Sequence, residues 1–216
     1  MSLARLLQLA SPTLPVGAYS YSGGLEAAIE AGAVHDAASA ERWIGDVLAF
    51  SVARMEAPIL FRFIHSFGQK DTNEIEHLNI QFLASRETAE LRAETVQMGY
   101  SMNRLLKDLG VGEVPVEEPS FPAAFAHAAV HWKIEPEAAL QAYLWAWLEN
   151  QVMAAVKAIP LGQTDGQRIL LSLGNLLPDF AKKAVAMKDQ DLGNFAPGLA
   201  LLSARHETQY SRLFRS

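Results

Sequence analysis

The chain carries six histidines, and histidine chemistry is most often metal binding or acid–base catalysis. His206 and Glu207 begin like a zinc-protease signature, but that site needs a second histidine where Tyr210 stands. Glu74 and His77 have the i, i+3 spacing of a di-iron bundle, which requires a second such pair and two further glutamates. No other histidine here has a glutamate three residues before it. The spacing therefore argues against both classes of metalloenzyme.

His127 and His131 lie one helical turn apart, so both imidazoles could face a single metal ion. No third ligand lies near them in sequence, and a core or surface role for the two histidines is the simpler interpretation. Ser20 and Ser22 lack the preceding glycine of a nucleophile elbow, and no phosphate-binding glycine loop occurs. We expect a protein without catalytic residues, cofactor or resident metal. The alternative is a helical metal-dependent enzyme built from scattered Glu and His residues.

Two other charged features have two interpretations each. Lys157 follows an apolar stretch, so it either buries its stem and extends its ammonium to solvent or offers that cation to a partner's phosphate or carboxylate. In residues 85–92, Arg86 and Glu90 are spaced i, i+4, and Glu87 can reach a neighbouring helix. This charged stretch is either a solvated helix face or a buried ionic lock.

The last residues, 203–216, combine large apolar side chains with three arginines. On a helix, one stripe would consist of His206, Tyr210, Leu213 and Phe214. A neighbouring stripe would hold Arg205, Gln209 and Arg212. Aromatic and leucine side chains beside guanidinium groups are typical of the core of a protein interface. Periodicity does not reveal whose surface is covered, so this helix packs either on its own domain or on a partner.

Composition limits the classes of function. Hydrophobic residues make up 50% of the chain and charged residues 19%, against roughly 25% charged in an average soluble domain. We infer that partners cover some of the apolar surface. The net charge of -6 argues against a nucleic-acid ligand, because phosphate contacts need clustered Lys and Arg. The absence of cysteine excludes disulfides and thiol nucleophiles.

Neither a signal peptide nor a membrane span is predicted. Residues 1–9 alternate apolar and polar side chains, and no segment approaches the roughly 18 apolar residues that a membrane helix needs. We expect a cytoplasmic protein with no membrane partner. No linker or repeat interrupts the chain, so residues 1–216 are predicted to form a single domain.

Apolar residues recur three and four positions apart almost throughout, which predicts an all-α helical bundle. Ser39 is the expected N-cap of a long helix, without a capping box, and Pro58 is the expected place of a bend. The stretch 136–159 is apolar on nearly all sides and is the expected central helix. Loops are predicted over residues 11–22 and 110–119. Helices are predicted over residues 2–10, 23–31, 39–67, 71–109 with one break, 121–132, 136–159, 165–187 and 197–212.

Residues 6–26, LLQLASPTLPVGAYSYSGGLE, resemble the opening signature of the UreF family of urease accessory proteins. Residues 85–92, 157–163 and 203–216 are similar to motifs of the same family in the same order. The resemblance implies an all-helical protein that forms a homodimer within a larger complex. It also implies a bridge between UreD, also called UreH, and the GTPase UreG in the complex that delivers nickel to the urease apoprotein.

The resemblance also implies roles for particular residues. The side chains expected to dock into UreD are His206, Tyr210, Arg212, Leu213, Phe214 and Arg215. Those expected to meet UreG, with an effect on GTP hydrolysis as one possibility, are Lys157 and Gln163. The residues expected to border the dimer axis or the route of nickel are Pro15, Gly17, Tyr19, Ser20, Ser22 and Glu26. Tyr19, Ser20 and Ser22 would supply weak oxygen ligands that let an ion move on, and the chain shows no strong nickel-binding set.

Overall fold

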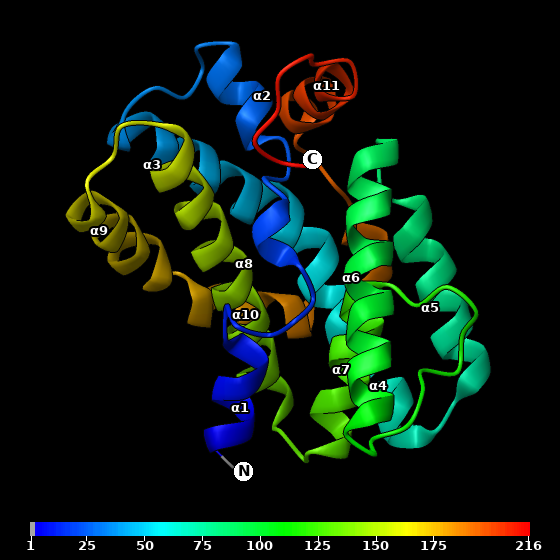
Figure 1. Cartoon of the computed structure of the whole chain (residues 1–216). Coiled ribbons are helices and arrows are strands. Elements are labelled where there is room, and N and C mark those ends of the chain that lie inside the picture. The colour runs from blue at the N-terminus through cyan, green and yellow to red at the C-terminus, as the bar shows by residue number, and fades with distance from the viewer. Residues whose placement is uncertain (1–2) are drawn as a thin grey trace.

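The structure, a computed structural model, describes residues 3–216, and over that range it is helical without any strand (Figure 1). The predicted all-α fold class is confirmed. The α-helices are α1 (Leu3–Ala10), α2 (Leu25–Glu30), α3 (Ala37–Val47), α4 (Ala57–Gln69), α5 (Thr72–Ala84), α6 (Ala89–Asp108), α7 (Phe121–His131), α8 (Pro136–Ala158), α9 (Gln163–Gly174), α10 (Leu177–Ala186) and α11 (Pro197–His206). A π-helix, η2 (Leu48–Glu56), and two 3-10 turns, η1 (Ala18–Ser20) and η3 (Asp189–Asp191), complete the described elements.

Helix α8 runs through the middle of the bundle, as predicted for the stretch 136–159 (Figure 1). It packs against helices from the whole length of the chain, namely α1, α2, α3, α4, α7, α9 and α10. Leu140, Leu144 and Leu148 are completely buried along it. Pro136 occupies the first turn, where a missing N–H costs nothing.

The long helical rod formed by α3, η2 and α4 starts earlier than predicted. Asp36, not Ser39, is the N-cap, and its carboxylate accepts the Ser39 N–H at 2.8 Å. The Ser39 hydroxyl accepts the Asp36 N–H in return, at 3.0 Å. The two residues therefore form a capping box, and the prediction that none exists was wrong because serine takes the place of the usual glutamate.

The irregularity predicted at Pro58 takes the form of the π-helix η2 just before it. Proline has no N–H, so the carbonyl of Arg54 loses its α-helical donor. Backbone groups of the 192–196 loop bond to this segment: Gly193 N–H donates to Arg54 O at 3.4 Å and Phe195 N–H donates to Phe50 O at 2.9 Å. A distant loop thus stabilises the interrupted helix.

The single break predicted within residues 71–109 is confirmed, and it lies between α5 and α6. Thr88 is the N-cap of α6, with its hydroxyl accepting the Leu91 N–H at 3.2 Å. Residues 85–88 are therefore not helical, and the predicted i, i+4 relation of Arg86 and Glu90 is wrong. Arg86 turns into the molecule, whereas Glu90 lies in the first turn of α6.

The predicted loop over 110–119 is confirmed and is held at several points. Asn79 donates to the Glu118 carbonyl at 2.9 Å and accepts the Ser120 N–H at 2.9 Å. At Gly99 of α6, an added Cβ would lie 2.0 Å from the carbonyl oxygen of Pro119. The loop backbone therefore rests directly on α6, at a position that only glycine allows.

Three predicted helices have different limits. The stretch 165–187 is two helices, α9 and α10, and Pro178 stands in the first turn of the second. Helix α2 begins at Leu25 because Gly23 and Gly24 both have positive φ, at 56° and 80°. Helix α11 ends at His206 instead of near residue 212.

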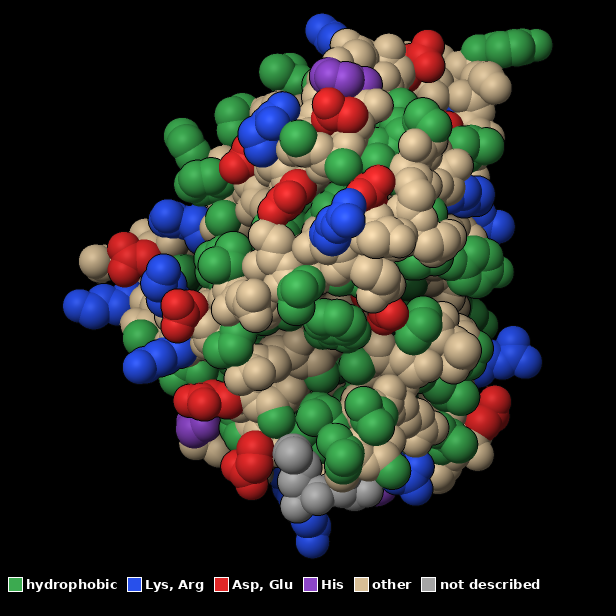
Figure 2. All heavy atoms as spheres, turned by 90° about the vertical axis from the view of Figure 1, so that its left-hand side faces the viewer, with side chains coloured by type: hydrophobic (Ala, Val, Ile, Leu, Met, Phe, Trp, Pro, Cys, Tyr) green, Lys and Arg blue, Asp and Glu red, His purple; other side chains and the backbone are tan. Residues whose placement is uncertain are grey.

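The surface mixes apolar and charged side chains. The face formed by α1, α3 and α9 shows hydrophobic side chains among charges of both signs (Figure 2). Leu3 and Leu7 of α1 are 62% and 60% exposed, and Leu171 of α9 is 71% exposed. Across residues 3–216, no helix combines the length and apolar character needed to cross a bilayer.

Candidate functional site

The C-terminal tail, residues 207–216, turns back over the bundle beside α2 and α6 instead of extending α11 (Figure 1). The four residues predicted to share a helical stripe are therefore separated. His206 and Phe214 are buried at 0% and 5% exposure. Tyr210 is fully exposed and Leu213 is 58% exposed. Two residues of the stripe, His206 and Phe214, thus pack on their own domain, and the other two, Tyr210 and Leu213, present a surface.

His206 ties three helices together. Its Nδ1 lies 2.6 Å from Glu90 Oε2 of α6, and its Nε2 lies 3.2 Å from Glu26 Oε2 of α2. The imidazole is completely buried, and each of its ring nitrogens lies within hydrogen-bond distance of a carboxylate oxygen. His206 is therefore a structural tie at the end of α11.

Glu26 explains why the chain leaves the helix after α11. Its two carboxylate oxygens accept the backbone N–H groups of Leu213, at 2.7 Å, and Phe214, at 2.9 Å. Hydrogen bonds to an ionised acceptor are about twice as strong as neutral ones. These two bonds hold the bend at Leu213 and Phe214 against α2.

Arg212 fixes the turn that precedes this segment. One end of its guanidinium pairs with Glu90 at 2.7 Å, while Nε donates to the Gln209 carbonyl at 2.9 Å and Nη2 to the Glu207 carbonyl at 2.6 Å. The side chain closes the turn around Tyr210. The exposed tyrosine is consequently presented on an ordered backbone.

The tail also contacts the loop that follows α1. Arg215 N–H donates to the Ser20 carbonyl at 2.8 Å, and Ser22 N–H donates to the Ser216 carbonyl at 2.9 Å. The Ser22 hydroxyl donates to the same carbonyl, and Ser22 is completely buried. Two sites that the sequence predicted as separate, the tail and this loop, therefore form one surface.

The remaining predicted residues of the loop lie further out. Tyr19 is 75% exposed and Pro15 is also exposed. Gly17 has a φ of 79°, a left-handed conformation that lets the loop turn into η1. Ser22 and Glu26, in contrast, are occupied by the tail.

Lys157 and Gln163 are both exposed, near the end of α8 and at the start of α9. The Lys157 ammonium lies 4.5 Å from the centre of the Phe214 ring. An exposed contact of this cation–π type contributes about 0.5–1 kcal/mol. The residue expected to meet UreG therefore touches the tail expected to meet UreD.

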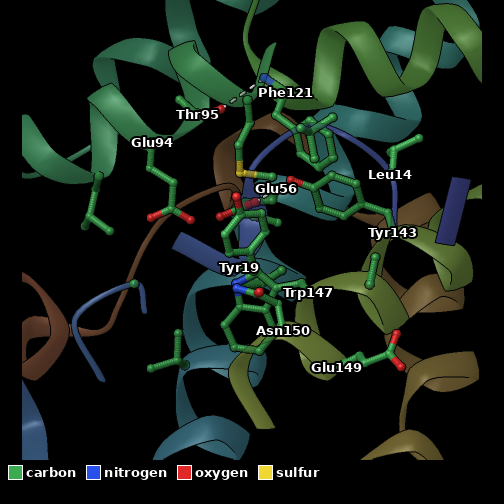
Figure 3. A pocket seen from close by; sticks show the side chains of 18 of the residues that line it. Leu14, Tyr19, Glu56, Glu94, Thr95, Phe121, Tyr143, Trp147, Glu149 and Asn150 are labelled. Carbon is green, nitrogen blue, oxygen red and sulfur yellow. Dashed lines mark hydrogen bonds between the residues drawn. The ribbon is translucent and has the colours of Figure 1, made fainter. Parts of the chain in front are cut away.

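A cavity of about 280 Å³ lies between the loop after α1, η2, α6 and α8 (Figure 3). A buried ion pair lines it: Arg86 Nη1 donates to Glu56 Oε1 at 2.9 Å, with side chains 7% and 12% exposed. The Tyr143 hydroxyl donates to Glu56 Oε2 at 2.6 Å, and burial together with this carboxylate raises the pKa of Tyr143. The buried-lock interpretation of Arg86 is confirmed.

Glu94 of α6 connects this cavity with the tail. Its carboxyl group lines the cavity and accepts the Ser216 hydroxyl at 2.7 Å. Burial raises the pKa of Glu94 to about 7. Glu56, Glu94 and Tyr143 were missed in the sequence, although an acidic residue inside the apolar run 47–64 was a signal for Glu56.

The histidines weighed as metal ligands are scattered. Glu74 and His77 lie exposed on α5, and His131 is exposed at the end of α7. His127 packs against Phe67 at 5.1 Å between ring centres, and burial lowers its pKa. Among residues 3–216, no three His, Asp or Glu side chains lie close enough together to hold an ion.

Comparisons with known proteins agree with the motifs. The family model named UreF matches residues 34–174. The chain is 56% identical to the urease accessory protein UreF of Azoarcus sp. (strain BH72), over 100% of this chain and 96% of that protein. It is 54% identical to that of Dechloromonas aromatica (strain RCB) and 51% identical to that of Janthinobacterium sp. (strain Marseille), over 100% of this chain and 98% of each relative.

Proposed function

The chain belongs to the UreF family of urease accessory proteins, and from that premise we propose that it is a non-enzymatic adaptor in urease maturation. It joins the UreD (UreH) scaffold to the GTPase UreG. Within the resulting complex it forms a homodimer and assists delivery of nickel to the urease apoprotein in the cytoplasm. Nickel is the cargo of this complex, and the adaptor holds no cofactor of its own.

The observation that carries the proposal is the ordered tail with exposed apolar side chains. Tyr210 is fully exposed and Leu213 is 58% exposed, while Arg212 and Glu26 fix the backbone on either side. An aromatic side chain on a prearranged backbone loses little entropy on binding, which favours a docking role. We assign this surface to UreD, with Arg212 and Arg215 at its edge.

His206 and Phe214 support the same surface from inside. Both are buried, so they position the tail and do not themselves reach a partner while the tail is in this conformation. Their contribution to UreD binding is therefore indirect. A partner that drew Phe214 out would also release Lys157 from its contact with that ring.

Lys157 and Gln163 supply the surface for UreG. Both are exposed and lie close in sequence at the junction of α8 and α9. A lysine offers a cation to a carboxylate or phosphate but lacks the planar fork of an arginine finger. We therefore assign Lys157 to recruitment of UreG. GTP turnover in the assembled complex should be equal with Lys157→Ala once UreG is bound.

The loop after α1 supplies the dimer contact and the border of the nickel route. Tyr19 and Pro15 are exposed on it, and the neighbouring Leu3 and Leu7 add apolar surface of the kind that a second copy can cover. Hydroxyl and carbonyl oxygens of the loop are weak ligands for nickel. A weak ligand set permits the ion to move on.

Point variants test the docking surface better than truncation, because removal of residues 206–216 would also remove the buried His206 and Phe214. We expect the double variant Tyr210→Ala/Leu213→Ala to remain folded and to lose capture of UreD by at least tenfold. Leu171→Ala, at a leucine of α9 that is 71% exposed, is the control. Capture of UreD at the wild-type level by the double variant would refute the assignment.

A further inference from the structure

A groove lies along α6, where the loop of residues 110–119 returns to that helix (Figure 1). One wall belongs to α6 and the other to the end of the loop. The residues that line the groove are Val96, Gln97, Tyr100 and Ser101 of α6 and Glu117, Glu118 and Pro119 of the loop. None of them belongs to the surfaces assigned above to UreD, to UreG or to the dimer.

The loop wall of the groove is fixed by contacts beneath it. Asn79 of α5 donates to the Glu118 carbonyl at 2.9 Å and accepts the Ser120 N–H at 2.9 Å. Pro119 is buried, and its carbonyl oxygen lies so close to Gly99 that no Cβ fits between them. Because these contacts already order the wall, a segment that enters the groove loses little affinity to ordering of this chain.

The groove combines an exposed aromatic ring with an unpaired carboxylate. Tyr100 is 64% exposed. Arg92 pairs with Glu118, whereas no Lys, Arg or His among residues 3–216 lies within ion-pair distance of the exposed Glu117. An arginine would satisfy both groups, because a guanidinium pairs with a carboxylate through two N–H groups and also stacks on an aromatic face. Charge complementarity therefore favours a basic occupant.

Gln97 connects the groove with the tail. Its side-chain oxygen accepts a hydrogen bond from Arg215 Nη1 at 3.4 Å and one from the Tyr21 hydroxyl at 2.5 Å, and the same residue lines the groove. The groove therefore begins beside the end of the tail. One partner can cover the tail and the groove together.

We propose that the groove holds an extended segment of the partner that docks on the tail, with an arginine of that segment stacked on Tyr100 and paired with Glu117. The inference rests on the proposed function, which assigns the tail to UreD, and it adds a second contact region. Val96 and Pro119 supply apolar surface for the stem of the arginine side chain. Because the contact contains an ion pair near solvent, it weakens as the salt concentration rises.

Titration of UreD into the full chain tests the groove. We expect Tyr100→Ala to weaken UreD binding at least tenfold and Glu117→Gln about fivefold, whereas Tyr100→Phe keeps the ring face and should stay within about twofold of the wild type. The effect of Glu117→Gln should shrink in about 1 M salt. The matched controls are Ile80→Ala, at a 57% exposed position of α5, and Glu113→Gln, at an exposed glutamate of the same loop outside the groove. Both controls should bind UreD as the wild type does.

A second measurement leaves Tyr100 and Glu117 in place. The chain has no cysteine, so Ser101→Cys introduces a single thiol into the groove. Bound UreD should slow alkylation of that thiol at least tenfold, as followed by mass spectrometry of this chain. Alkylation at the same rate with and without bound UreD would overturn the proposal.

The outcomes separate this inference from the proposed function. Wild-type affinity for UreD in Tyr100→Ala and Glu117→Gln, together with loss of UreD in Tyr210→Ala/Leu213→Ala, would overturn the groove contact and leave the adaptor role intact. A loss confined to UreG binding or to self-association would overturn the assigned occupant. Absence of UreD binding by the wild-type chain would refute the proposed function and this inference with it.

Discussion

At the scale of single residues, three carboxylates determine where the tail lies. Glu26 and Glu90 share His206, Glu26 also accepts two backbone N–H groups of the tail, and Glu94 accepts the Ser216 hydroxyl. Carboxylates this close to one another and to the interior need positive or hydrogen-bonding partners. His206 at the end of α11 and the tail together supply them: Arg212 of the tail pairs with Glu90, and tail N–H and hydroxyl groups donate to Glu26 and Glu94.

His206→Ala should therefore destabilise the protein. Loss of the imidazole leaves two buried carboxylate oxygens without their shared partner, and we expect the free energy of unfolding to fall by about 2–3 kcal/mol. Urea denaturation followed by circular dichroism measures the change. His77→Ala, at an exposed position of α5, should stay within about 0.5 kcal/mol of the wild type. An equal loss of unfolding free energy in both variants would contradict a stabilising role for the bonds between His206 and the two glutamates.

Glu94 should make the stability depend on pH. Burial raises its pKa from the ordinary 4.5 to about 7, so the folded protein holds this proton more tightly than the unfolded chain does. Ionisation of Glu94 therefore lowers the free energy of unfolding as the pH rises from about 4.5 to about 7, and the penalty is complete above that range.

Glu94→Gln removes the ionisation and keeps an oxygen acceptor for Ser216. We expect the variant to gain stability relative to the wild type as the pH rises from 5 to 8, by about 1–3 kcal/mol in total. Urea denaturation at both pH values measures the difference, with Glu76→Gln as the exposed control. A gain that is the same at both pH values would contradict the raised pKa.

Most of these residue-level contacts lie beyond the reach of sequence rules. The bonds of His206 join residues 116 and 180 positions apart, and the bond between Arg86 and Glu56 spans 30 positions. Helical periodicity relates residues only three or four positions apart. The sequence therefore indicated that Arg86 could be buried in an ionic lock, but it could not identify the partner.

At the scale of helices, the apolar pattern of α8 was predictive, and the interruptions near Pro58 and within residues 71–109 were expected without their form or exact position. The central helix α8 was predicted because an apolar surface on all sides is a local signal. A break within residues 71–109 was predicted from the length of that stretch, but the Thr88 cap that sets its place was missed. The π-helix η2 and the end of α11 depend on distant groups, namely the backbone of Gly193 and Phe195 and the carboxylate of Glu26. Where these two elements begin and end therefore depends on tertiary contacts, which a local sequence pattern does not contain.

Gly99 gives a prediction at this scale. A Cβ at residue 99 would lie 2.0 Å from the Pro119 carbonyl oxygen, so Gly99→Ala must push the loop away from α6. We expect a loss of about 3 kcal/mol or more in the free energy of unfolding. Gly68→Ala is the matched control, because this helical glycine of α4 has no atom within 4 Å of an added Cβ. That substitution should stabilise by about 0.5–1 kcal/mol; similar losses in both variants would contradict the close contact.

At the scale of the whole molecule, the tail joins segments from both ends of the chain into one surface. It contacts the loop after α1 through Ser20 and Ser22, and it reaches the end of α8 through Phe214 and Lys157. The surfaces assigned to UreD, to UreG and to the dimer therefore share one structural element. A change in the position of the tail would therefore alter all three surfaces.

Arg212 tests whether the tail must be prearranged to bind. Its guanidinium closes the turn around Tyr210 through Glu90 and two backbone carbonyls, so Arg212→Ala should loosen that turn without unfolding the bundle. We expect the affinity for UreD to fall by about 2 kcal/mol, roughly 30-fold, in a calorimetric titration. Arg168→Ala, which removes an exposed arginine of α9 paired with Asp165, should change it by less than about 0.5 kcal/mol.

The double variant Arg212→Ala/Tyr210→Ala separates positioning from direct contact. If Arg212 acts by holding Tyr210 in place, removal of the tyrosine leaves the arginine with little to position. The loss of UreD affinity in the double variant should then be smaller than the sum of the losses in the two single variants. Full additivity would mean that Arg212 contributes to UreD binding independently of Tyr210. Wild-type affinity in Arg212→Ala would show that the partner does not depend on the prearranged turn, and the docking surface would then have to be sought elsewhere on the bundle.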